Sequence, residues 1–192
     1  MDIYEAIRAR RNVHKFKEEE VPRDKLKKAL EAGLQASSAF NQQPWEFIVI
    51  TDRDQIRKVA QFKYDNTKQG LLASNVSQEE AEQYAGNQRD AFTNSVPVVL
   101  IYNKEKMLAI ESCWNCITTI WLAASAEGLG VSPAYFALHV QDPVKQTLGI
   151  PEGYDIAAIL RIGVPEVIPD AKPRKGLEEC LHSNRFGGGQ MP

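Results

Sequence analysis

Residues 108–127 read LAIESCWNCITTIWLAASAE and form the longest apolar segment with helical spacing in the chain. Near one side of this helix fall Ile110, Cys113, Ile117, Ile120, Trp121 and Ala124. Apolar residues also occupy its other faces, and a helix that is apolar all round is normally buried. Gly128 and Gly130 follow, and glycine commonly ends helices. We therefore expect a thick central helix that is covered on nearly every side.

Apolar runs of strand length lie on either side of this helix in the sequence. VPVVLIY at 96–102 and IAAILRIGV at 156–164 are continuous, which is typical of strands covered on both faces. WEFIVIT at 45–51 and the segment 131–138 are predicted as two further strands. Because strands so far apart in sequence need crossover connections, we expect part of the sheet to be parallel.

Helical patterns account for much of the remaining chain. They cover residues 2–10, 22–34, 53–61, 78–93, 142–149 and 176–182, whereas 62–79 shows no sustained period. One thick apolar helix and about four strands predict an α+β fold. We expect a single domain over residues 1–192, built as a three-layer sandwich with a mixed central sheet flanked by helices.

Composition excludes several classes of protein. The 192 residues include 23 Lys and Arg and 25 Asp and Glu, for a net charge of -2. This balance argues against nucleic acid as a partner, because duplex binders carry a basic excess. No stretch reaches the roughly 18 apolar residues that a membrane span needs. The opening MDIYEAIRARR lacks the apolar core of a secretory signal, so we expect a soluble, cytoplasmic protein without a membrane partner.

Motifs for self-sufficient chemistry are absent from the sequence. There is no GxGxxG after a strand, no GxxxxGK[ST] and no GxSxG. His14, His139 and His182 do not have metal-ligand spacing, so no metal site is predicted. The cysteines of Cys113-Trp114-Asn115-Cys116 lie inside the predicted helix, whereas reactive CxxC pairs sit at a helix N-terminus. We interpret them as core residues and expect any chemistry to come from a cofactor.

Three polar segments are candidates for binding. RARRNVHKFK at 8–17 and KPRK at 172–175 concentrate cations, and arginine binds phosphate through its planar fork. Charge runs of this kind also commonly face water. SSAFNQQPW at 37–45 offers hydroxyl and amide groups on a short connection, which is equally consistent with an ordinary helix-to-strand turn.

Five motifs in order resemble the FMN-dependent nitroreductase family, and the resemblance spans essentially the whole chain. They are RRNVHKF at 10–16, SAFNQQPW at 38–45, AEGLG at 126–130, LGIPEGY at 148–154 with IGVP at 162–165, and KPR at 172–174. Members of this family are α+β homodimers that hold two FMN molecules between the subunits. The resemblance therefore implies a homodimer with FMN as its cofactor.

The resemblance also implies roles for individual residues. Arg10, Arg11 and Asn12 would hold the FMN phosphate and ribityl chain, and Lys172 and Arg174 would close on the phosphate, with Lys175 as a substitute for Lys172. Ser37, Ser38, Ala39 and Asn41 would reach the flavin from the other subunit, and Phe40 would lie over the substrate pocket. Asn87 would pair with the pyrimidine edge, and the backbone of Pro133, Ala134 and Tyr135 would lie by flavin N5.

Two positions depart from the family pattern. The family usually has Ser at the position of Asn12, and Arg or Lys at that of His14, which would also contact the cofactor. An imidazole with a pKa of about 6.5 is mostly neutral at pH 7. The sequence therefore predicts a flavin potential that varies with pH more than in a Lys or Arg homologue.

The activity implied by the resemblance is that of an NAD(P)H oxidoreductase. NAD(P)H would give hydride to flavin N5 and leave, and a nitroaromatic, quinone or related small-molecule acceptor would then be reduced in a ping-pong cycle. No catalytic side chain is needed, because the flavin carries the chemistry. Three alternatives stay open: another reductive reaction of the family such as dehalogenation or enone reduction, a non-catalytic flavin store or sensor, and a thiol-disulfide protein.

Overall fold

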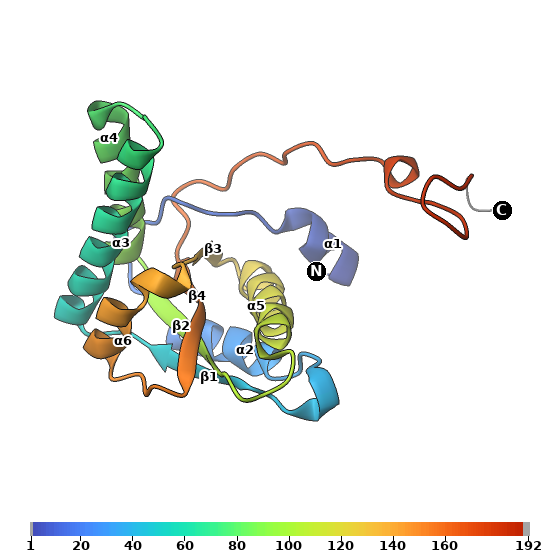
Figure 1. Cartoon of the computed structure of the whole chain (residues 1–192), viewed down its shortest axis with the longest axis horizontal. Helices are drawn as coiled ribbons and strands as arrows, with labels where there is room; N and C mark the ends of the chain where they lie inside the picture. Colours follow the sequence, from blue (N-terminus) through green and yellow to red (C-terminus); the bar gives the residue numbers. More distant parts are fainter. Residues whose placement is uncertain (1, 190–192) are drawn as a thin grey trace.

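A computed structural model describes residues 2–189 of the chain. Its centre is a four-stranded sheet with helices on both faces (Figure 1). The strands are β1 (Trp45–Val49), β2 (Val96–Asn103), β3 (Gly130–Ala134) and β4 (Tyr154–Gly163), in the spatial order β1-β2-β4-β3. The predicted three-layer α+β sandwich is therefore confirmed.

The prediction of a mixed sheet is wrong for these four strands, because all neighbouring pairs are antiparallel. Strands β2 and β3 do run in the same direction, as a helical crossover requires, since both pair antiparallel with β4. However, β4 lies between them, so they share no hydrogen bonds. The described residues contain a single parallel bridge, between Asn12 and Val131 outside the named strand pairs.

Six α-helices surround the sheet: α1 (Ile3–Ala9), α2 (Arg23–Gly33), α3 (Arg53–Ala73), α4 (Gln78–Thr93), α5 (Ala109–Ala126) and α6 (Asp142–Leu148). Short 3-10 turns cover Ala39–Asn41, Leu138–Val140 and Leu177–Glu179. Helix α3 continues through most of the segment without a clear period and packs along α4. The strand expected to end at 138 ends at Ala134, and the helix expected at 176–182 is only the last of the 3-10 turns.

Two apolar cores lie on the two faces of the sheet. On one face, α5 and α2 pack over β2 and β4, and Cys113, Cys116, Ile117 and Ile120 of α5 are fully buried. On the other face, side chains of α3, α4 and α6 complete the second core. Helix α5 is not covered all round as expected, because Trp114 is 39% exposed and Asn115 is exposed beside it.

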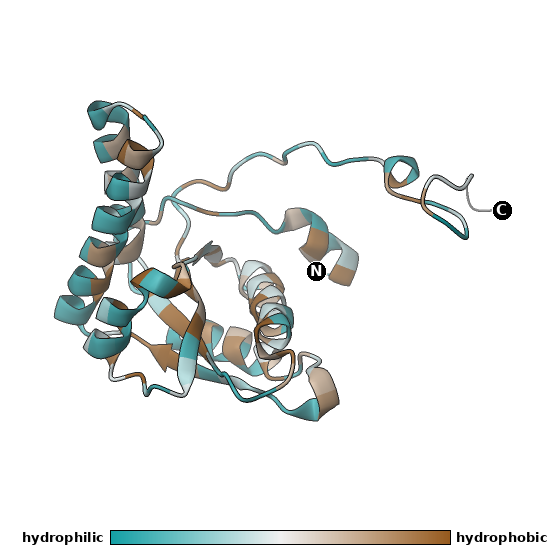
Figure 2. Cartoon of the chain, in the orientation of Figure 1, coloured by the Kyte–Doolittle hydropathy of each residue, from teal (hydrophilic) through white to brown (hydrophobic). Residues whose placement is uncertain are grey.

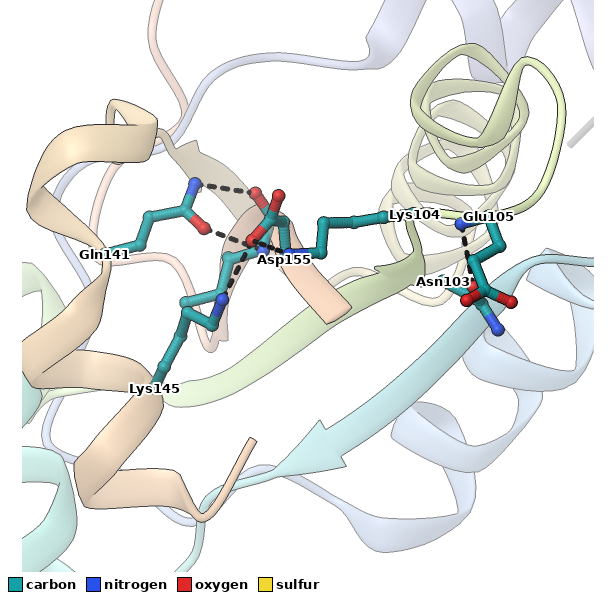
Figure 3. Close-up of polar contacts among 7 residues, drawn as sticks. Asn103, Lys104, Glu105, Gln141, Lys145 and Asp155 are labelled. Carbon is teal, nitrogen blue, oxygen red and sulfur yellow. Dashed lines mark hydrogen bonds and ion pairs between the residues drawn. The ribbon is translucent and has the colours of Figure 1, made fainter. Parts of the chain in front are cut away.

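A buried amide and an ion pair attach the region of α6 to β4 (Figure 3). The Gln141 side chain accepts from the backbone N–H of Ile156 at 2.8 Å and donates to the carbonyls of Phe136 and Ile156 at 2.9 and 3.0 Å. Lys145 Nζ lies 2.8 Å from Asp155 Oδ1, with both side chains largely buried. These contacts fix the chain between β3 and β4.

The chain after β4 leaves the sandwich as an extended tail, which Figure 1 shows reaching away from the other elements. Several apolar side chains of this tail are exposed: Val167, Ile168, Leu177 and Phe186. Helix α1 also exposes Ile3, Tyr4 and Ile7, and Figure 2 shows apolar colouring on both segments. Within residues 2–189, no helix combines the length and apolarity needed to cross a bilayer.

Candidate functional site

The segment that contains the first cationic motif lies against β3 and the end of β4. The Val13 N–H donates to the carbonyl of Val131 at 3.1 Å, and Phe16 forms a bridge with Pro165. Val13 and Phe16 are buried over two glycines: a Cβ on Gly130 would lie 2.8 Å from Val13 Cγ1, and one on Gly163 would lie 2.6 Å from Phe16 Cδ1. Small residues at both positions therefore let the segment dock closely.

Arginines from both ends of the chain meet beside α5. The Arg10 guanidinium stacks over the Trp121 ring at 4.2 Å from its centroid, and Trp121 Nε1 donates to the carbonyl of Arg11 at 2.9 Å. Arg11 Nε donates to the carbonyl of Pro169 in the tail at 3.1 Å. Burial lowers the pKa of Arg10, and the like charges of Arg174 and Arg11 lower it further.

None of these three arginines forms an ion pair within the part of the chain that the structure describes. Like charges repel, so a cluster without a carboxylate is stabilised by an added anion. The cluster is therefore suited to bind a phosphate or another anion.

A second cationic group surrounds His14. Ser132 Oγ lies 3.3 Å from His14 Nδ1 and accepts from Arg161 Nη2 at 2.6 Å. Arg161 is only 1% exposed, and burial lowers its pKa to about 10. The pKa of His14 is lowered as well, first by burial and then by the charges of Arg161 and Lys172. The structure thus brings Lys172 of the tail close to His14.

Arg161 was not predicted from the sequence. It is the charged residue inside the apolar run IAAILRIGV, and a charged side chain in a strand covered on both faces is rarely buried without a specific reason. That interruption is the signal by which it could have been found.

Asn87 of α4 and His14 line a common hollow of about 280 Å³. A larger hollow of about 360 Å³, between residues 18–26 and α3, includes none of the predicted site residues. Beyond β3, Lys63 Nζ donates to the carbonyl of Tyr135 at 3.1 Å. Burial and the charge of Arg161 lower the pKa of Lys63. Pro133 and Ala134 therefore lie on the strand next to that of Arg161, and Tyr135 follows directly after this strand, where its carbonyl accepts from Lys63.

The loop that contains the second motif lies elsewhere, near the start of α5. Asn115 Nδ2 donates to the carbonyl and the hydroxyl of Ser37 at 3.2 and 3.3 Å, and the Ala39 N–H donates to Ser112 Oγ at 3.2 Å. The Gln43 N–H donates to Ser38 Oγ at 3.0 Å. These contacts tie the loop to two residues of the first turns of α5.

Phe40 and Asn41 both adopt positive φ, and Phe40 is 79% exposed. Ser112 precedes Trp121 by nine positions, or about 13 Å along a helix. The loop and the arginine cluster therefore contact different turns of α5. Lys175 is exposed on the tail.

The two cysteines of α5, Cys113 and Cys116, are unsuited to redox chemistry. Cys113 and Cys116 are fully buried, and burial raises the pKa of each thiol to about 12. Within residues 2–189, no group of three or more His, Cys, Asp or Glu side chains could hold a metal ion. The described site is thus rich in cations and amides but offers no activated nucleophile.

Fold and site together define an α+β sandwich with a group of arginines that have no ion-pair partner among residues 2–189. The chain belongs to the nitroreductase family, whose model matches residues 7–164. The resemblance found in the sequence motifs is thereby confirmed.

Individual relatives have several different reactions. An iodotyrosine deiodinase from Thermotoga neapolitana is 28% identical over 188 residues, which cover 93% of this chain and 95% of the relative. An NADPH-flavin oxidoreductase from Vibrio harveyi is 24% identical over 186 residues, covering 95% of this chain and 73% of the relative. One of these relatives is thus named for iodotyrosine and the other for NADPH and flavin.

Solved structures have the same fold. An iodotyrosine deiodinase bound to FMN and 3-iodo-L-tyrosine superimposes with a TM-score of 0.82 at 22% identity, covering 96% of this chain and 100% of that one. An FMN-dependent nitroreductase from Clostridium difficile gives a TM-score of 0.73 at 23% identity, covering 94% and 98%.

Proposed function

We propose that this protein is an FMN-dependent NAD(P)H oxidoreductase that reduces a nitroaromatic, quinone or related acceptor. The observation that carries the proposal is the group of Arg10, Arg11 and Arg174, which come from opposite ends of the chain and have no carboxylate partner within residues 2–189. A phosphate monoester is the anion that such a cluster fits, and FMN carries one. The deiodinase and nitroreductase structures named above support the same cofactor.

Each predicted residue has a task in this proposal. Arg10, Arg11 and Arg174 would bind the phosphate, and Asn12 would donate to the phosphate or ribityl chain. The sequence motifs assigned Lys172 to the phosphate, but its charge acts on His14, so we place Lys172 with His14 and Asn87 at the pyrimidine edge. The backbone of residues 133–135 would lie by the ring. Bound FMN would supply the two-electron chemistry between NAD(P)H and the acceptor. The protein's own part is to bind, orient and shield, which agrees with the absence of an activated nucleophile among the described residues.

A homodimer follows from the separation of the two motif regions along α5. The Ser37–Asn41 loop of one protomer would complete the site that contains the arginines of its partner. Exposed apolar residues support an interface: Ile3 and Ile7 of α1, Phe40 of the loop, Trp114 of α5 and Phe186 of the tail. Contiguous apolar patches mark interaction surfaces, and a dimer interface that brings these side chains together would cover them.

The cofactor is tested by its phosphate. The purified protein should bind FMN much more tightly than riboflavin, measured by quenching of flavin fluorescence. Arg10→Ala with Arg174→Ala should reduce that preference by tenfold or more, since each charged hydrogen bond contributes about 1.5–3 kcal/mol. Arg23→Ala removes an exposed charge of α2 as the matched control and should change nothing. Equal affinity of the wild type for both flavins would refute the proposal.

Turnover is tested by anaerobic addition of NADH or NADPH to the FMN-loaded protein. An enzyme should lose its visible flavin absorbance within seconds, at ordinary turnover rates of about 1–1,000 per second. A protein that binds FMN but keeps its colour would instead be a flavin store or sensor.

The shared site is tested by mixing two defective proteins. One has Arg10→Ala and Arg174→Ala, and the other has Ser38→Trp in the loop. Subunit exchange produces hybrid dimers with one intact site each, so about a quarter of all sites should recover FMN binding. Binding that stays at the level of the unmixed variants would contradict a site shared by two protomers.

Reductive dehalogenation is the second candidate, favoured by the deiodinase that matches this chain over 93% of its length. Steady-state assays with a nitroaromatic, a quinone and 3-iodotyrosine separate the two. A kcat/KM for iodotyrosine above that for the other acceptors would select dehalogenation.

A further inference from the structure

Ser132 Oγ lies between two groups with different hydrogen-bonding capacity. It is 2.6 Å from Arg161 Nη2 and 3.3 Å from His14 Nδ1. A guanidinium can only donate, so the Ser132 oxygen accepts from Arg161. The hydroxyl proton is then available to His14 Nδ1, which can accept it only when it carries no proton itself. The ring proton of a neutral imidazole must in that case sit on Nε2.

The geometry points to a charged hydrogen-bond relay, Arg161–Ser132–His14, that holds His14 as the neutral Nε2–H tautomer. His14 is exposed, whereas Arg161 and Ser132 are buried behind it. The relay therefore presents one N–H donor at the surface of the site, polarised by a positive charge that the ligand never touches. The ligand that it fits is an electron-rich ring nitrogen or carbonyl oxygen.

The charge behind the relay is not neutralised within the described chain. Arg161 forms no ion pair there. It donates to the carbonyl of Ser132 at 3.3 Å and to the side-chain and backbone oxygens of Gln88 at 2.8 and 3.5 Å, and its guanidinium lies 5.3 Å from the centroid of the Phe92 ring. Burying an uncompensated charge is costly, and such groups cluster at functional sites. We therefore assign Arg161 as a positioning residue rather than a structural one.

Other charged groups near His14 are Lys172 of the tail and, around the hollow, Lys15, Asp90 and Glu166. Asp90 already pairs with Arg89 at 3.2 Å. Arg161 and Lys172 lower the pKa of His14, in addition to burial. Both cations thus favour the neutral ring that the relay requires.

The last step of the inference rests on the proposed function. The electron-rich acceptor is then the pyrimidine edge of FMN, which gains negative charge on reduction. Family members usually have Arg or Lys at position 14. In this chain the fixed charge is on Arg161 of β4, which is linked to His14 by hydrogen bonds through Ser132. The pH dependence of the flavin potential that the sequence predicts from His14 should therefore have its midpoint below the usual value of about 6.5.

The relay itself is tested without any flavin. In the full-length apoprotein labelled with 15N-histidine, the His14 ring should show a protonated Nε2, an unprotonated Nδ1 and a midpoint below the usual value. The His14 signals are identified by their loss in His14→Gln. Ser132→Ala and Arg161→Gln should each raise the midpoint, because the first removes a donor to the neutral ring and the second removes a nearby positive charge. Lys58→Gln removes an exposed charge of α3 as the control and should leave it unchanged.

Circular dichroism checks that each variant is folded. If Arg161→Gln does not fold, Ser132→Ala decides, because it removes one hydroxyl and leaves the guanidinium in place. A wild-type ring protonated on Nδ1, or a midpoint that a folded variant does not change, would overturn the relay.

A second measurement addresses the ligand. In FMN-loaded protein, Ser132→Ala and Arg161→Gln should shift the flavin midpoint potential to more negative values, while affinity for FMN falls less than tenfold. If the wild type binds no FMN, the proposed function is refuted, and the NMR measurement alone then decides whether the relay exists. Bound FMN with an unchanged potential in both variants would overturn the donor role of His14.

Discussion

Helices α2 and α5 meet at Gly33, and a single added methyl group there should force them apart. A Cβ on Gly33 would lie 2.9 Å from Ile120 Cδ1 and 3.2 Å from Cys116 Sγ, and closer still to Ile120 Cγ1. Ile120 and Cys116 are both fully buried, so neither can turn into solvent. The substitution Gly33→Ala therefore overfills a packed core.

Two opposing effects set the magnitude. Alanine is favoured over glycine in a helix by up to about 1 kcal/mol, and by less at Gly33, the last residue of α2. Overpacking a core costs about 1–3 kcal/mol. We expect Gly33→Ala to lower the free energy of unfolding by about 1–2 kcal/mol. The matched control is Gly70→Ala in α3, where a Cβ meets nothing within 4 Å and should stabilise the protein by about 0.5–1 kcal/mol.

Removing the obstructing side chain should reverse the effect of Gly33→Ala. Ile120→Ala alone should cost about 2–5 kcal/mol, because it leaves a cavity. In that background the methyl group at position 33 fills part of the cavity, so Gly33→Ala becomes neutral or stabilising. The two substitutions should therefore couple by about 1–3 kcal/mol.

Urea unfolding of the four apoproteins, followed by circular dichroism at one protein concentration, measures this cycle. Flavin is omitted because ligand binding shifts apparent stability. A Gly33→Ala protein at least as stable as the wild type, or an equal loss in both backgrounds, would refute the packing argument.

Three further outcomes are expected. Burial raises the pKa of Cys113 and Cys116 to about 12, so alkylation of the native protein at mildly alkaline pH should modify only the exposed Cys180. Mass spectrometry counts the labels, and a second label added as rapidly as the first would contradict this prediction. Because the pKa of His14 is lowered, the unfolded chain takes up a proton there that the folded chain does not, so stability should fall as pH drops below about 6.5. Urea titrations should show a weaker decline in His14→Gln, and identical pH slopes would count against it. Gln141→Met should lower the free energy of unfolding by about 2–4 kcal/mol, because it leaves the buried N–H of Ile156 on β4 unpaired. A loss below about 1 kcal/mol, measured by urea unfolding, would be inconsistent with that role.

The layers of the fold were predictable from the sequence because their signals are local. The strands around 96–102 and 156–164 are continuous apolar runs, and α5 has helical spacing with glycines after its end. The second half of α3 was not predictable, because Tyr64, Asn66 and Gly70 break its period. Packing along α4 supplies what the local pattern lacks.

Strand order was beyond the reach of local patterns for a different reason. The crossover through α5 joins two strands of like direction, as the sequence indicated. The later insertion of β4 between them is a tertiary event that periodicity does not record.

For the site, the motifs and their order supplied the candidate residues, and the structure showed how these residues are grouped. The motifs named Arg10, Arg11 and Arg174, and in the folded chain the charges of Arg174 and Arg11 lower the pKa of Arg10. Arg161 had no motif to mark it and was visible only as a charge in an apolar strand. Its role depends on Ser132, a neighbour on another strand that no sequence spacing connects to it.

Helix α5 holds the Ser37 loop near its start and the Arg10–Arg11 backbone near its end. The loop contacts Ser112 and Asn115, whereas Arg10 and Arg11 contact Trp121, so a substitution in the loop removes none of the contacts of the two arginines. Substitutions in the loop can therefore change the surface that the loop presents while the contacts of Arg10 and Arg11 with Trp121 stay in place. The loop can thus change in sequence while the residues that hold the arginines are kept. This is one physical route by which a single fold acquires new substrates.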